Sequence, residues 1–173
     1  YSIEAEGLIY ASVRTNSGSV NQHAGGLVAK GNSALGKRFR AGAMLNTSNI
    51  SGLLNFFSIL ATENNTTITI SNILPGTLLS NGTIYDGTQI IPLNKNQSYI
   101  LAIDGLEGFN LIGALIESDK NIVVNSGSFG GTNDPTDAPA TGNGPGRDIG
   151  FDQIVGSDKI GTEYIFIKGN GFD

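Results

Sequence analysis

The chain has no cysteine and little histidine, proline or charge. Of its 173 residues none is Cys or Trp, one is His and five are Pro, and Asp, Glu, Lys and Arg together make up only 14%. The absence of Cys excludes thiol catalysis, disulfide bonds and Cys-ligated zinc. A His-dependent triad or a His-ligated metal cluster would depend on His23 alone, and no G-x-S-x-G motif is present. The sequence therefore predicts no catalytic residues, and we expect His23 to lie on the surface or in a turn.

Two further absences limit the partners of the chain. No apolar run approaches the ~18 residues that a membrane-spanning helix needs. The formal net charge is -5, and the only tight basic group is Lys37, Arg38 and Arg40. On a regular strand Arg38 and Arg40 share one face while Lys37 points to the other, so we expect a solvated strand face and not a phosphate site. The sequence predicts neither a nucleic-acid partner nor direct insertion into a membrane.

Glycine and β-forming residues are abundant instead. Gly accounts for 25 residues, and Thr, Val and Ile recur between turns rich in Asn and Gly. The clearest alternation is TTITIS at Thr66–Ser71, whereas the most apolar stretch, Leu53–Thr62, fits a buried helix nearly as well as a strand. We interpret both as strands and predict an all-β fold, an antiparallel β-sandwich of jelly-roll-like or Ig-like type, with no helix beyond a turn at Asn32–Leu35. Further strands are expected at Gly7–Thr15, Ala24–Lys30, Lys37–Asn46, Thr88–Leu93, Ser98–Asp104, Leu111–Glu117, Asn121–Gly127 and Glu163–Lys168.

The most apolar pair of strands is expected on either side of Ser118–Asn121. This segment reads as a hairpin turn between LIGALIE and NIVVNSG. Because both flanking strands are nearly continuous apolar runs, we expect the hairpin to be central and covered on both faces. Ile122 and Val124 are then predicted on one face and Val123 on the other.

The region that most resembles a site is the long loop Gly130–Gly146 and the acid-bearing connection that follows it. Calcium is bound by oxygen ligands, which four acids here could supply: Asp134, Asp137, Asp148 and Asp152. Their spacing does not match the D-x-D-x-D-G pattern, and no pair of acids is marked as spanning a cleft for glycoside hydrolysis. We therefore expect a connection between strands that is ordered by hydrogen bonds, with Arg147 linked to a carboxylate such as Asp148 or Asp152. No cofactor is expected, and calcium at these four acids is the alternative.

Five stretches, in one order along the chain, resemble a known family. The chain is similar to the N-terminal domain family of the IgGFc-binding protein, as found in Bacteroidetes surface proteins that carry gliding-motility-associated C-terminal sorting domains. The stretches are AGGLVAKGNSALGKRFRAG (Ala24–Gly42), FSILATENNTTITIS (Phe57–Ser71), LNKNQSYIL (Leu93–Leu101), ESDKNIVVNSGS (Glu117–Ser128) and RDIGFDQIVGSDKIGTEYIFIKGNG (Arg147–Gly171).

The resemblance implies an extracellular β-rich module of a large secreted surface protein, without established catalytic residues. Residues 1–173 would form a single such module, an excerpt of a larger multidomain chain. The expected function is non-catalytic adhesion or ligand binding at the bacterial cell surface, with a protein or glycan partner and with neighbouring domains of the same chain. The alternative is a structural spacer in a filamentous cell-surface or gliding-motility protein, and a carbohydrate-active enzyme ranks third.

Surface aromatic residues distinguish the first two functions. An exposed aromatic patch favours a binding module, whereas a flat surface of Thr and Asn favours a spacer. The candidate aromatic residues are Tyr10, Tyr85, Tyr99 and Phe109, and for each of them a place in the core is also open.

Overall fold

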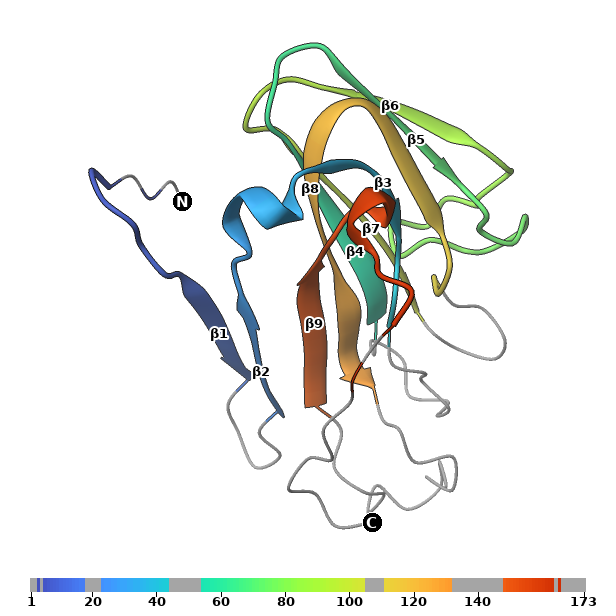
Figure 1. Cartoon of the computed structure of the whole chain (residues 1–173). Coiled ribbons are helices and arrows are strands. Elements are labelled where there is room, and N and C mark those ends of the chain that lie inside the picture. Colours follow the sequence, from blue (N-terminus) through green and yellow to red (C-terminus); the bar gives the residue numbers. More distant parts are fainter. Residues whose placement is uncertain are drawn as a thin grey trace.

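The computed structural model describes residues 3, 5–17, 23–43, 54–104, 111–131, 148–163 and 165. These residues form nine strands and two short 3-10 helices (Figure 1), and every paired strand is antiparallel, which confirms the all-β prediction. The strands are β1 (Ser12–Ser17), β2 (His23–Val28), β3 (Gly36–Arg40), β4 (Leu54–Ala61), β5 (Thr66–Ser71), β6 (Gln89–Leu93), β7 (Ser98–Asp104), β8 (Leu115–Gly131) and β9 (Asp148–Ile154). The helices are η1 (Gly31–Ala34), where a helical turn was expected, and η2 (Ser157–Lys159).

The 17-residue strand β8 organises the main sheet because it hydrogen-bonds along both of its edges. Its first half lies between β5 and β3, and its second half lies between β4 and β9. β6 continues the sheet beyond β5, and β7 continues it beyond β4. The chain therefore builds one seven-stranded sheet with two arms that share β8, and β1 and β2 pair in a separate two-stranded sheet. The arms, β6-β5-β8-β3 and β7-β4-β8-β9, are called the two sheets below, and Figure 1 shows β8 arching from one to the other.

The prediction of a hairpin at residues 118–121 is wrong, because β8 continues through this segment without a turn. The strand bends there but does not reverse its direction (Figure 1). Polar groups of this segment instead bind the start of β5 and the turn that precedes it. Thr67 N donates a hydrogen bond to Asp119 Oδ1 at 2.8 Å, and Thr62 Oγ1 donates to Asn121 O at 2.6 Å. Partner strands pair with β8 up to Ser118 and again from Ile122, so the segment forms a corner of one strand and not a reversal of the chain.

Alternation along the strands produces the core between the two sheets. In β4 every second residue from Asn55 to Ala61 is buried, which confirms the expected strand over Leu54–Ala61 and excludes a helix there. In β8, Ile122 and Val124 are fully buried as predicted, but Val123 is only half-buried. The expectation that this strand is covered on both faces is therefore wrong, because the outer face of its sheet stays open to solvent. The fully buried large side chains include Phe39, Phe57, Ile59, Ile68, Ile70, Tyr85, Leu101, Ile103, Leu111 and Ile116.

Several element boundaries differ from the expected ones. β1 begins at Ser12 and not at residue 7, and β8 begins at Leu115 and not at residue 111. The largest difference is β9, since residues 148–154 were expected in a connection and instead pair with β8 from Val124 to Gly131. The strand expected at residues 163–168 falls mostly outside the described residues, and Glu163 and Ile165 are not in a strand.

Candidate functional site

The acids proposed for calcium are only partly described. Asp134, Asp137 and Arg147 lie outside the described residues, and for Asp148 only the backbone at the start of β9 is described. Asp152 lies in β9, where its carboxylate forms an ion pair with Lys30 Nζ at 2.5 Å. Among the residues that the structure describes, no group of three or more acidic, His or Cys side chains could hold a metal ion. Asp152 thus acts as the partner of a lysine that lies far away in the sequence.

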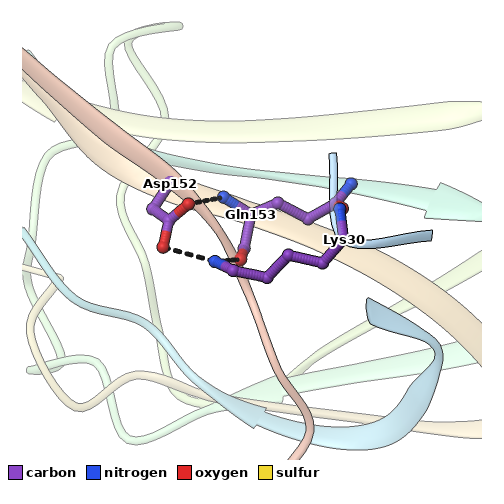
Figure 2. Close-up of polar contacts among 3 residues, drawn as sticks. All are labelled: Lys30, Asp152 and Gln153. Atoms are coloured by element: carbon purple, nitrogen blue, oxygen red, sulfur yellow. Dashed lines mark hydrogen bonds and ion pairs between the residues drawn. The ribbon is translucent and has the colours of Figure 1, made fainter. Parts of the chain in front are cut away.

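Lys30, Asp152 and Gln153 form a closed set of contacts between the end of β2 and β9 (Figure 2). Lys30 Nζ also donates to Gln153 O, Lys30 N donates to Gln153 Oε1 at 2.5 Å, and Gln153 N donates to Asp152 Oδ1 at 2.8 Å. Farther along, β2 approaches β9 so closely that a Cβ at Gly25 would lie 2.3 Å from Ile149 O. The ion pair is largely exposed and contributes little stability by itself, so we assign the set a positioning role for β2.

The aromatic residues singled out from the sequence do not form a described surface patch. Tyr85 is fully buried, its hydroxyl donates to Ile70 O at 3.3 Å, and burial raises its pKa. Tyr99 packs against the core, donates to Gln89 Oε1 at 3.3 Å, and also has a pKa raised by burial. Tyr10 is exposed ahead of β1, and Phe109 lies outside the described residues. Tyr85 and Tyr99 therefore belong to the packing of the domain.

Three phenylalanines that the sequence did not single out come together on the outer side of the β7-β4-β8-β9 sheet. Phe56 of β4 stacks on Phe129 of β8 with ring centroids 4.8 Å apart and an interplanar angle of 27°. Phe151 of β9 lies 6.5 Å from Phe56, tilted by 47°. Phe129 remains 41% exposed and the other two rings are half-buried. These three side chains are called the aromatic face below.

A glycine at the centre of the row allows the rings to meet. Gly127 is the direct cross-strand partner of Phe56 on one side and of Phe151 on the other. Directly paired residues project from the same side of a sheet, so any side chain at this position would stand between the two rings. A Cβ at Gly127 would lie 2.1 Å from Gly150 O and 2.5 Å from Phe151 Cα. The close approach of β8 and β9 at this point therefore requires glycine.

Further apolar and polar residues surround the aromatic face on the same side of the sheet. Ile100 of β7 is 64% exposed and is paired with Ser58, two residues along β4 from Phe56. Ser58 is paired in turn with Asn125 of β8. Because Phe56 and Phe129 turn their ring faces toward each other, the accessible surface consists largely of ring edges beside an aliphatic side chain. Such a surface suits apolar side chains of a protein better than the flat face of a sugar ring.

The fold and this exposed cluster define the class of the protein, an antiparallel β-sheet module with an accessible aromatic cluster on one face. In the described part of the chain no helix is long and apolar enough to cross a membrane. The family model of the IgGFc binding protein matches residues 25–173, and the chain belongs to this family. No curated protein and no solved structure matches the chain. The family part of the resemblance seen in the sequence is thereby confirmed.

Proposed function

We propose that this domain is a non-catalytic extracellular module of a cell-surface adhesin, and that it binds a protein partner through the aromatic face. The observation that carries the proposal is the solvent-accessible cluster of Phe56, Phe129 and Phe151 on an open sheet. Aromatic side chains are enriched at protein interfaces because each buries a large area with few rotatable bonds.

The family supports a protein as the partner. Its description names binding to the Fc part of IgG, which is a protein ligand. The ring arrangement points the same way, since stacked rings leave edges and few free faces for sugar stacking. The Fc fragment of IgG is therefore the first probe, and matrix proteins follow, because an adhesin contacts the material that surrounds the cell.

The spacer function is supported by the outer side of the other sheet. There the outward residues of β5 are Thr67, Thr69 and Ser71, and Glu117 of β8 pairs with Arg38 at 3.4 Å. This surface is polar and its two charges neutralise each other, which suits repetition without self-association. Such a module in a filamentous or gliding-motility protein would position other domains and would bind no external partner.

A binding array decides between the two functions. The purified domain is applied to the Fc fragment of IgG, to matrix proteins and to a glycan series. We expect a protein probe to bind, and Phe129→Ser to weaken that binding about tenfold. The matched control is Ile90→Ser, which removes a 67% exposed apolar side chain from β6 on the polar side of the molecule and should leave binding unchanged. Binding to glycans alone, or equal effects of the two variants, contradicts the proposal, and binding to no probe supports the spacer.

A further inference from the structure

A second candidate site lies where η1, β3, the bend of β8 and η2 meet. These elements enclose an open groove of about 810 Å³. Its polar lining includes Asn32, Lys37, Arg38, Asn121, Asp158 and Lys159. It is called the basic groove below, and it shares no residue with the aromatic face.

A break in the strand register lies at two adjacent basic residues of the groove, Lys37 and Arg38. Gly36 pairs with Ile122 and Arg38 pairs with Glu117, so four residues of β8 lie opposite Lys37 alone. Bulges of this kind re-aim side chains that would alternate on a regular strand. Lys37 was expected on the opposite side of a regular strand from Arg38, and in the structure both residues are exposed and both line the groove.

The charges of the groove are unbalanced. Lys159 Nζ is held against Ser33 O and Leu35 O, and Arg38 uses its Nε to approach Glu117 at 3.4 Å. Among the described residues Lys37 has no ion-pair partner. The single acid of the lining, Asp158, lies over Gly156, since a Cβ at Gly156 would be 2.5 Å from Asp158 Oδ1. With Glu117 counted against Arg38, the cations Lys37 and Lys159 face the single carboxylate of Asp158, so the groove keeps a positive excess on a chain whose net charge is -5.

We propose that the basic groove binds the acidic group, carboxylate or sulfate, of an anionic glycan. Lys37, Arg38 and Lys159 supply the positive charge, and Asn32 and Asn121 supply amide groups for the hydroxyls beside the acidic group. The lining offers only one large apolar side chain, the half-buried Leu35, so an acidic peptide would find little apolar contact. At physiological salt charges are screened beyond about 8 Å, and the groove therefore attracts an anion despite the acidic remainder of the chain.

The proposal is tested by calorimetric titration of the domain with two hexasaccharides of equal length, one of heparin and one of hyaluronan. We expect at least one to bind, more weakly at about 300 mM than at about 50 mM salt. Binding of heparin alone identifies sulfate as the recognised group, and binding of hyaluronan identifies carboxylate. If neither hexasaccharide binds, the proposal is overturned.

Charge-reversal variants distinguish binding in the basic groove from a general attraction between the glycan and any lysine on the surface. Lys37→Glu should weaken binding about tenfold, or about 1.4 kcal/mol, and Lys37→Gln should weaken it less. Lys95→Glu makes the same change in net charge at an exposed lysine between β6 and β7 and should leave the affinity within about twofold. Equal losses in Lys37→Glu and Lys95→Glu contradict a site in the groove. Lys37 is exposed, so thermal melts should show that Lys37→Glu and Lys37→Gln are both folded. If Lys37→Glu does not fold, the affinity of Lys37→Gln still tests the site.

Discussion

The two halves of β8 present opposite kinds of surface on the outside of the molecule. In the first half the outward residue Glu117 stands between Thr69 of β5 and Arg38 of β3, so the row is polar and its charges are paired. In the second half the outward residue Gly127 stands between Phe56 of β4 and Phe151 of β9, and the backbone of β9 approaches it closely. One strand thus contributes a hydrophilic face to one sheet and a largely apolar face to the other.

This difference shows that the open side of a sheet need not be hydrophilic. A polar row keeps a sheet soluble and separate from its neighbours, whereas an accessible aromatic cluster costs solvation and is typical of a contact surface. The composition of the whole chain averages over both faces. Its 39% of hydrophobic residues therefore reveals neither the polar face nor the aromatic face. The features that support the two proposed functions, binding and spacing, lie on two different sides of the chain.

The largest expected effect on stability lies in the second half of β8, where inward and outward side chains differ in burial. Val124 is fully buried between the sheets and Val123 is half-buried on the outer side. Val124→Asp should lower the free energy of unfolding by about 4 kcal/mol, because it buries an unpaired carboxylate, and Val123→Asp by about 1 kcal/mol. Urea unfolding of the two variants measures this, and equal losses would show that both sides of the strand are covered.

The aromatic side of β8 should be intolerant of even one methyl group. Gly127→Ala places a Cβ against the backbone of Gly150 and Phe151, so we expect a loss of about 2 to 3 kcal/mol. Gly42→Ala is the matched control, since a Cβ there meets no atom within 4 Å, and it should change stability by less than about 0.5 kcal/mol. Thermal melts that place the two variants together would disprove the close approach of β8 and β9.

On the polar side, the corresponding change should have little effect. Glu117→Gln removes one charge of the ion pair with Arg38. The side chain of Glu117 is 45% exposed and that of Arg38 is 58% exposed. Exposed pairs of this kind contribute little, so the expected loss is below about 0.5 kcal/mol, and it should vanish at high salt. A loss comparable to that of Gly127→Ala would contradict the difference between the two faces of β8, because it would show both to be equally constrained.

The smallest expected effect is that of calcium on thermal stability, through the acids Asp148 and Asp152 in the segment that follows β8. Because Asp152 is already paired with Lys30, we expect thermal melts in EDTA and in millimolar calcium to coincide. A bound ion at a hundredfold excess over its Kd would add about 2.7 kcal/mol to the stability. An upward shift with calcium that is lost in Asp148→Asn and Asp152→Asn would instead establish a metal site.

The sequence predicted those parts of the fold that depend on local alternation. β5 was predicted with its observed bounds, because Thr and Ile alternate over its whole length. Residues 118–121 were misread because the same polar residues that form a turn can also bind a neighbouring strand at a bend. β9 was missed because its pairing depends on the free second edge of β8, which no local pattern reports.

The candidate sites were less predictable because they arise from register. The adjacent pair Phe56 and Phe57 in a strand indicates that one ring faces outward, and this was the single local signal for the aromatic face. Its two other members, Phe129 and Phe151, join it only through the pairing of β8 with β4 and β9. Likewise, Lys37 enters the basic groove through a break in register that alternation cannot foresee.

Hydroxyl-radical footprinting of the complex tests the central claim most directly. The domain is oxidised alone and together with the Fc fragment or matrix protein that it binds in the array, and the modification of single residues is measured by mass spectrometry. The account predicts that Phe129 is protected in the complex while Ile90, equally apolar and more exposed, is oxidised as in the free domain. Protection of Ile90 with unchanged oxidation of Phe129 would place the partner on the polar side and contradict the account.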